Sequence, residues 1–239
     1  MFSIVTATYN AGKLLDRTMA SLRAQTYRGF EWLIVDGGSK DDTVARIQAA
    51  GNLVSRYVSE RDEGIADAWN KGIAMAGAQH VLILNAGDTY DANCLETIAQ
   101  RVDGQRIVCS HARLATEDGR DVGMFLSQPH KLRRAMHLAH NWCAVPLQHY
   151  RALGPYAKIP LAMDFDWFHR YYCKFGVQGF DVVDQALGTY YLGGASDVNY
   201  RSSFGANERI LVAHGMSPLT ARFYRMSYTL KHAIVSRMR

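Results

Sequence analysis

One pattern repeats through the first 90 residues of the chain: a short apolar run, a cluster of polar residues and a segment with helical spacing. The apolar runs lie at Ser3–Thr8, Phe30–Val35, Leu53–Val58 and Val81–Leu84. Helical spacing is found over Leu14–Leu22, Asp41–Ile47 and Ile65–Ala76. Strands that alternate with helices in this way predict βαβ units and a parallel sheet. The apolar residues Trp32–Val35 are typical of a strand buried on both faces.

The pattern loosens after Asp91. We expect a helix over Asp91–Gln100, a strand over Ile107–His111 and a hairpin that turns at Asp118-Gly119. An aromatic helix through Tyr171-Tyr172 and a helical tail from Pro218 follow. No stretch has the composition of a linker, so we expect one domain over 1–205, with halves at 1–100 and 101–205, and a basic helical tail over 206–239.

Composition is that of an ordinary globular protein, with 48% apolar and 21% charged residues among 239. The four cysteines form no C-x-x-C pair, so we expect free, buried thiols in a reducing compartment. The N-terminus does not resemble a signal peptide, and no run of 18 apolar residues is present. These features predict a cytoplasmic location.

The net charge of +5 comes from the end of the chain. Six of the 27 basic residues and none of the 22 acidic ones lie between Arg209 and Arg239. This argues against a nucleic-acid partner, which would favour a basic patch on the body, and suits contact with an anionic membrane. An apolar stripe runs along the tail at Leu219, Phe223, Met226, Leu230 and Ile234, with Arg222, Arg225 and Lys231 outside it. The stripe fits a membrane, the domain or a second subunit equally well, and oligomeric state is not predicted.

Polar clusters follow all four predicted strands of the first half. They are Thr8-Tyr9-Asn10, Asp36-Gly37-Gly38-Ser39, Glu60-Arg61-Asp62 and Asn85-Ala86-Gly87-Asp88. In parallel sheets, ligands bind outside the carboxyl ends of the strands. The chain lacks G-x-G-x-x-G after its first strand, G-x-x-x-x-G-K-[ST] and G-x-S-x-G, which argues against dinucleotide dehydrogenases, P-loop ATPases and serine hydrolases.

Several carboxylates allow two interpretations, a role in catalysis or ligand binding and a purely structural role. Asp67 and Lys71 share a helix face that is either solvated or turned toward a phosphorylated ligand, with Arg61 nearby. Asp88 either caps a helix or holds Mg²⁺ or Mn²⁺ beside substrate phosphates. Asp164 and Asp166 either cap the aromatic helix or supply a general base.

Together these motifs resemble glycosyltransferase family 2, the inverting GT-A enzymes, in the branch that builds bacterial surface polysaccharides such as colanic acid and O-antigen. The segments that match are 3–10, 30–43, 59–72 and 84–88, with weaker marks at 164–166 and 193–196. The resemblance implies an α/β GT-A fold. It has a Rossmann-like half that binds a nucleotide sugar, a half that binds the acceptor and a mostly parallel central sheet.

The resemblance also implies roles for individual residues. Asp164 would be the catalytic base, Asp88 would hold Mn²⁺ or Mg²⁺, and Asp36 would hydrogen-bond the base of the nucleotide. The substrates would contact Thr8, Tyr9, Asn10, Asp36, Gly38, Ser39, Arg61, Asp62, Asp67, Lys71, Asn85, Ala86, Gly87 and Asp166. Asn85 and Gly87 stand where the family has acids, and Met163 replaces a Glu, which leaves Asp164 and Asp166 as alternative bases.

The resemblance implies an enzyme that transfers a sugar from a nucleoside-diphosphate sugar, with UDP as the expected nucleotide. The acceptor would be a hydroxyl of a lipid-linked saccharide at the cytoplasmic face of the inner membrane. Two other functions remain open. A nucleotide-sugar nucleotidyltransferase would carry a Gly-rich basic loop after the first strand, in which Thr8–Lys13 is poor. A non-catalytic subunit that binds sugar nucleotides is compatible with the reduced metal motif.

Overall fold

The computed structural model describes residues 1–193 and 200–237, with the side chains of 1–193 and 201–230. The first half contains β1 (Phe2–Thr8), α1 (Gly12–Arg23), β2 (Phe30–Asp36), α2 (Thr43–Ala49), β3 (Arg56–Ser59), α3 (Ile65–Met75), β4 (His80–Ile83), β5 (Thr89–Tyr90) and α4 (Cys94–Ala99). The second half contains β6 (Ile107–Ala115), β7 (Asp121–Phe125), β8 (Cys143–Pro146), α5 (Leu147–Leu153), α6 (Met163–Phe175), β9 (Phe180–Tyr191), α8 (Tyr200–Ala213) and α9 (Pro218–Arg237). Short 3₁₀ turns lie at Gly51–Leu53, Pro129–Lys131, His140–Trp142 and Val177–Gly179.

The strands form one sheet in the order β3-β2-β1-β4-β8-β6-β9-β5, with β7 paired to β6. Strands β1 to β4 are mutually parallel, as the repeat in the first half predicts. The second half joins through β8, which runs antiparallel to both β4 and β6. The prediction of an α/β fold with a mainly parallel sheet is confirmed.

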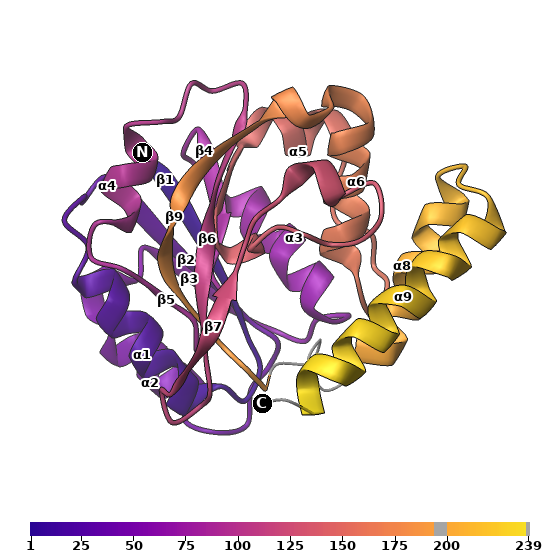
Figure 1. Ribbon diagram of the computed structural model, residues 1–239. Helices are drawn as coiled ribbons and strands as arrows, with labels where there is room; N and C mark the ends of the chain where they lie inside the picture. Colours follow the sequence, from indigo (N-terminus) through magenta and orange to yellow (C-terminus); the bar gives the residue numbers. More distant parts are fainter. Residues whose placement is uncertain (194–199, 238–239) are drawn as a thin grey trace.

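Helices cover both faces of the sheet (Figure 1). Leu15, Ile34 and Leu82 belong to the core that α1, α2 and α4 cover, whereas Val5 and Leu33 belong to the core beneath α3, α5 and α6. Neighbouring residues of a strand point to opposite faces, so apolar strands need a helical layer on each side. This explains the near-continuous apolar runs.

The structure corrects some expected boundaries. The third strand begins at Arg56, because residues from Gly51 form a 3₁₀ turn, and α4 begins at Cys94 instead of Asp91. Cys94, Cys109 and Cys143 are buried as expected, but Cys173 is exposed. It lies in the last turn of α6, where it and Lys174 are exposed while Phe175 packs against the core.

Helices α8 and α9 form a hairpin that packs on the body beside α6 (Figure 1). Leu211 and Ala221 are buried in the core, and the Tyr228 hydroxyl lies 3.0 Å from His137 Nε2. The division at residue 206 stays a prediction and falls inside α8. The predicted apolar stripe does not face the body, because Leu219, Phe223, Met226 and Leu230 are 81%, 66%, 59% and 64% exposed. The side chains of Lys231 and Ile234 lie outside the described residues.

None of the helices described is both long enough and apolar enough to cross a bilayer.

Candidate functional site

The sheet order brings all four polar clusters to neighbouring strand ends. β1 lies between β2 and β4, and Thr8 pairs in register with Asp36 at the carboxyl ends of β1 and β2. Asn85–Asp88 follow β4, and Glu60–Asp62 follow β3 at the other end of this row. The weaker family mark at 193–196 lies outside the described residues beyond Gly193.

Asp36 organises the loops at these strand ends. Its carboxylate is fully buried and accepts five hydrogen bonds, from the hydroxyls of Thr8, Ser39 and Ser59 and from the N–H groups of Gly38 and Ser39. Burial alone would raise the pKa of Asp36, but the hydrogen bonds from Ser39 and Ser59 outweigh it and lower the pKa. The base contact implied for Asp36 stays a prediction; here the carboxylate holds the loop.

A second set of contacts shapes the start of α1. Asn10 adopts a positive φ of 49°, accepts a hydrogen bond from Lys40 N–H on Oδ1 and donates its own N–H to Ser39 Oγ. Thr43 Oγ1 accepts from the N–H of Ala11. Tyr9 is 65% exposed, so the loop presents an aromatic ring to solvent beside a fixed backbone.

The helix face on α3 is an ion-pair network. Asp67 Oδ1 lies 2.8 Å from Lys158 Nζ and its Oδ2 lies 3.4 Å from Lys71 Nζ, which also contacts Glu60 at 2.7 Å. The hydrogen bond from Lys158 lowers the pKa of Asp67, and the bond to Glu60 raises the pKa of Lys71. Lys158 comes from the loop before α6, so this pairing joins the two halves of the domain.

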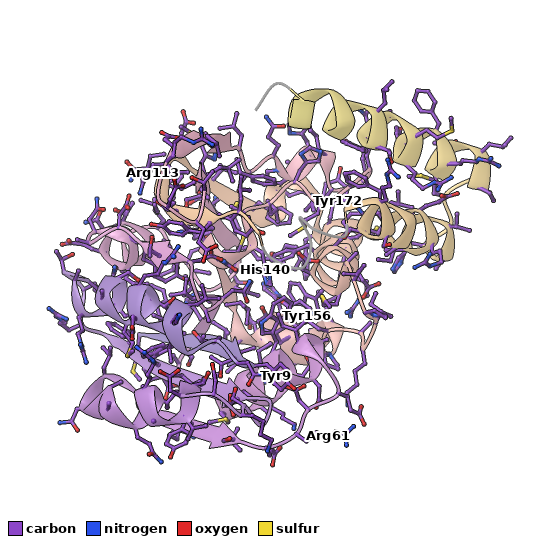
Figure 2. All side chains as sticks on the ribbon, turned by 90° about the horizontal axis from the view of Figure 1, so that it is seen from below. Tyr9, Arg61, Arg113, His140, Tyr156 and Tyr172 are labelled. Carbon is purple, nitrogen blue, oxygen red and sulfur yellow. The ribbon has the colours of Figure 1, made fainter. Side chains whose placement is uncertain are left out.

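Arg61 and Tyr9 lie on the same side of the molecule (Figure 2). The Arg61 side chain is exposed. The neighbouring Asp62 is half-buried and accepts from the N–H of Gly64 at 2.9 Å. Its carboxylate lies so close to Gly37 that a Cβ there would overlap it. Gly38 has a φ of +81°, which suits glycine. The two glycines therefore let the loops after β2 and β3 approach closely.

Asp88 lies on the wall of a cavity of about 650 Å³. Its Oδ2 accepts from Asn141 Nδ2 and its Oδ1 accepts from the N–H of Tyr191 at 3.0 Å. Thr18 Oγ1 fixes the loop by donating to the Asp88 carbonyl at 3.0 Å and accepting from Gly87 N–H. Asn85, Ala86 and Gly87 line the same cavity. The four predicted residues of this motif are thus brought together.

Asp164 lines the same cavity, whereas Asp166 does not. Asp164 stands in the first turn of α6, directly after Ala162 and Met163, and Ala162 adopts a left-handed φ of 64°. Asp166 is paired with Arg170 Nε at 3.0 Å and with His214 Nε2 at 3.2 Å. The two alternative bases therefore have different surroundings.

His140 is a residue of the candidate site for which the sequence pattern predicts no role. It lines the cavity, and its Nε2 lies 3.0 Å from the Tyr156 hydroxyl. His140 and Tyr156 are both labelled near the middle of Figure 2. Burial lowers the pKa of His140 to about 4, although the nearby Asp164 charge acts to raise it. The imidazole is thus neutral at pH 7. His140 lies in the 3₁₀ turn that leads into β8, away from the carboxyl ends of the parallel strands, so the sequence pattern does not mark it.

Arg17 is a second cavity residue that the sequence pattern does not identify, because it too lies away from the carboxyl ends of the strands. It lies on α1, lines the cavity, and stacks its guanidinium 4.0 Å from the centre of the Tyr191 ring. Its Nη1 is buried without a hydrogen-bond partner. Within residues 1–193 and 200–237, no group of three His, Cys, Asp or Glu side chains is placed to hold a metal. Any cation here would need other oxygen ligands.

Comparison with solved structures shows which fold this is. Staphylococcus aureus TarS 1-349, in complex with UDP-GlcNAc, superposes with a TM-score of 0.70 and 15% identity over 97% of this chain and 72% of that one. The mannosyltransferase PcManGT from Pyrobaculum calidifontis, in complex with GDP-Man and Mn²⁺, has a TM-score of 0.64 and 16% identity over 98% and 75%. These likenesses show the GT-A fold that the resemblance implied.

Proteins that are similar in sequence are also named glycosyltransferases. A PGL/p-HBAD biosynthesis glycosyltransferase of Mycobacterium bovis (strain BCG / Pasteur 1173P2) is 39% identical over 104 residues, 41% of this chain and 40% of that protein. Glycosyltransferase GlyG of Streptococcus pneumoniae is 30% identical over 125 residues, 50% of this chain and 42% of that protein. The match thus spans about two fifths of these relatives' length. The family model for Glycosyl transferase family 2 matches residues 3–153, more than half of the chain, and the chain therefore belongs to that family.

Proposed function

We propose that this chain is an inverting, metal-dependent glycosyltransferase. In this proposal it moves a sugar from a UDP-sugar to a hydroxyl of a lipid-linked saccharide, in the assembly of a bacterial surface polysaccharide. The observation that carries the proposal is that Asp88 and Asp164 line one cavity of about 650 Å³ beside the strand ends. A donor phosphate near Asp88 and an acceptor hydroxyl near Asp164 would then share one space.

The residues near Asp88 carry the type of ligand atom that a divalent cation binds. Mg²⁺ and Mn²⁺ prefer oxygen ligands. Besides the Asp88 carboxylate, the side-chain oxygen of Asn85 lies buried on the same wall without a hydrogen-bond partner. When bound, the cation would supply positive charge to offset the charge that develops on the leaving diphosphate. Asp88 would hold it, and the few protein ligands predict weak binding unless the donor is present.

The chain's own residues would perform the remaining chemistry. The Asp164 carboxylate accepts the proton of the acceptor hydroxyl as its oxygen forms a bond to the anomeric carbon. The bond from that carbon to the diphosphate oxygen breaks, and the nucleoside diphosphate leaves with the electron pair. Because attack comes from the opposite face, configuration inverts. Asp36 keeps Thr8 and Ser39 in place for the nucleotide, and the Asp67–Lys158 pair holds the loop that leads into α6, the helix that carries Asp164.

The apolar walls of the second half support a saccharide acceptor. Leu114, Phe125, Leu138, Leu161 and Leu192 line the cavity. Such surfaces can pack against the apolar faces of sugar rings. The acceptor's lipid would lie near α9, whose exposed stripe and the basic residues after Arg209 suit the anionic cytoplasmic leaflet of the inner membrane.

The experiment has two parts. A panel of UDP-, GDP- and dTDP-sugars is screened by thermal shift with and without Mn²⁺, because a ligand at 100 times its Kd stabilises by about 2.7 kcal/mol. Transfer of radiolabelled sugar is then measured for Asp164→Asn, Asp166→Asn and the exposed control Asp184→Asn. We expect Asp164→Asn to lose about 10²- to 10⁴-fold in turnover, Asp166→Asn to lose less and the control to lose nothing.

Three results would contradict the proposal. If Asp164→Asn retains turnover while a folded Asp166→Asn is inactive, the base is misassigned. If no nucleotide sugar binds or is turned over with either metal, transfer from such donors is not the function. Retained configuration in the product, read by NMR of its anomeric proton, would exclude inversion.

A further inference from the structure

An arginine without a counter-ion lies in the wall of the cavity. Arg17, on α1, is half-buried and lines the cavity together with Tyr191. Other half-buried arginines, such as Arg46, Arg113 and Arg170, each pair with a carboxylate. No carboxylate among the described side chains forms such a pair with Arg17. Its positive charge is therefore available to a ligand.

Tyr191 holds this guanidinium by one face. Arg17 Cζ lies 4.0 Å from the centre of the Tyr191 ring, a contact that uses the face of the planar group and leaves its in-plane N–H donors free. Nη1 is shielded from solvent and has no hydrogen-bond partner. Nε and Nη2 have no partner among the described residues either, but they remain accessible, so this edge faces the cavity. Such an edge can donate two parallel hydrogen bonds to a carboxylate or a phosphate.

Two contacts fix the surroundings of the guanidinium before any ligand binds. Thr18, the next residue of α1, donates from Oγ1 to the Asp88 carbonyl oxygen at 3.0 Å. Tyr191, which stacks on Arg17, donates its N–H to Asp88 Oδ1, also at 3.0 Å. The helix and the strand end that hold Arg17 are thus tied to the same residue. A donor held in this way loses little conformational freedom when it binds a ligand.

Arg17 is a different cation from those that the sequence predicts for the substrates. Arg61 and Lys71 do not line the cavity, and Lys71 is already paired with Glu60 and Asp67. Among the described residues that line the cavity, Arg17 alone carries a permanent positive charge. A charge in a half-buried wall loses part of its hydration, and an anion is the partner that offsets this loss.

We propose that Arg17 is an anion-binding subsite of this cavity, with Tyr191 as its positioning residue, and that it takes a phosphate or carboxylate group of a substrate. The inference rests on the proposed function. Such a group has two sources, the diphosphate of the donor and an acidic group on the acceptor saccharide. The planar set of N–H donors on arginine matches the oxygens of either group. The substrate that carries the group should therefore bind more tightly than its neutral analogue.

The test compares charged and neutral probes on the full chain in EDTA, so that no metal contributes. UDP against uridine reports on the donor, and glucuronate against glucose reports on the acceptor. Binding is followed by NMR titration, in which the Nε–H signal of Arg17 reports contact with the guanidinium itself. Arg17→Gln is compared with Arg23→Gln, which removes the same charge from an exposed position of the same helix. We expect Arg17→Gln to weaken one charged probe about 10- to 100-fold, and to leave its neutral counterpart unchanged within about twofold.

Two further variants separate anion binding from a structural role. Arg17→Lys keeps the charge but loses the planar set of donors, so we expect it to lose part of the affinity for the charged probe. Tyr191→Leu keeps the N–H that binds Asp88 and removes the ring, and it should weaken the same probe less than Arg17→Gln does. A structural role would weaken charged and neutral probes alike. If Arg17→Gln fails to fold, Arg17→Lys and the Nε–H signal of the wild type carry the test.

The outcomes separate the two sources and the two proposals. A loss for UDP identifies the anion as the diphosphate, a loss for glucuronate alone identifies an acidic acceptor, and either result supports the subsite. If Arg17→Gln binds every probe as the control does, or loses charged and neutral probes equally, this inference is wrong and the proposed transferase stands. The inference is also wrong if the wild type binds neither charged probe. If the wild type binds glucuronate through Arg17 but no nucleotide sugar, the subsite stands and the proposed function is wrong.

Discussion

Removing the buried imidazole of His140 should change how stability depends on pH. Burial lowers the pKa of His140 to about 4 in the folded chain, whereas an unfolded histidine titrates near about 6.5. Between these values the unfolded state binds the proton and the folded state does not. The free energy of unfolding therefore rises with pH across this window. The stability is fully present above about pH 6.5 and is lost as the pH falls toward 4.

The size of the effect follows from the two pKa values. Each pKa unit is worth about 1.36 kcal/mol, so proton uptake by His140 in the unfolded state lowers the free energy of unfolding by about 2 kcal/mol between pH 7.5 and pH 5. His80 and His169 have pKa values that burial also lowers, and they add to the same slope. A variant at position 140 keeps those two histidines, so their contribution cancels in the comparison with wild type.

The assay is urea unfolding followed by tryptophan fluorescence at four pH values from 7.5 to 5. We expect His140→Gln to be less sensitive to pH than wild type by about 2 kcal/mol over this interval. The loss of packing and of the Tyr156 hydrogen bond shifts all points together and does not enter the difference. His130→Gln, at an exposed position, should keep the wild-type slope. Equal slopes for His140→Gln and wild type would refute the assignment of a buried, neutral imidazole.

Two further predictions concern packing and the tail. Gly188→Ala should destabilise the fold by about 1–3 kcal/mol, because a Cβ would overlap the Thr89 carbonyl oxygen and the Trp142 ring. Gly205→Ala, inside α8, should be neutral or stabilising in the same unfolding assay, because among the described residues a Cβ there would meet only the Arg209 side chain. Equal losses of stability in the two variants would contradict this reasoning. The variant Leu219→Ser/Phe223→Ser/Met226→Ser should lose flotation with vesicles of equal parts phosphatidylcholine and phosphatidylglycerol, while unchanged flotation would exclude α9 as the membrane contact. These exposed positions are preferable to deletion of α9, which would uncover the core around Ala221.

The first half of the fold was predictable because its signals are local. Strands such as Phe30–Asp36 are nearly all apolar, and each is followed by a polar cluster at a strand end. In a parallel sheet those ends meet at one edge, so sequence order alone brings Thr8 near Asp36. The motif at Asn85–Asp88 is found in the same way, since it follows the apolar β4.

The second half depends on contacts that local patterns do not encode. β8 is four residues long, yet it joins β4 to β6 and thereby carries His140 and Asn141 into the cavity. β9 contributes the Tyr191 N–H that binds Asp88, although the residues lie 103 positions apart. Arg17 sits in an amphipathic helix, where an arginine predicts only a solvated side chain. These residues become visible only when the sheet is assembled.

The charges around the cavity would oppose the binding of a negatively charged donor unless a cation binds with it. Lys71 is balanced by Glu60 and Asp67, and Asp166 is balanced by Arg170, so none of these contributes much free charge. Among the described residues that line the cavity, three carry a carboxylate, Asp88, Glu117 and Asp164, and one, Arg17, carries a guanidinium, while His140 is neutral.

A nucleoside diphosphate brings further negative charge into this acidic space, where Coulomb repulsion is stronger than in bulk water. One arginine cannot offset both the diphosphate and three carboxylates, but a divalent cation bound together with the diphosphate can. In the proposed transferase, the acids that reduce affinity for the free nucleotide would therefore be the groups that make its affinity depend on the metal. This charge balance favours the proposed catalytic site over a passive sugar-nucleotide-binding subunit, which would gain nothing from placing Asp164 in the same cavity as Asp88.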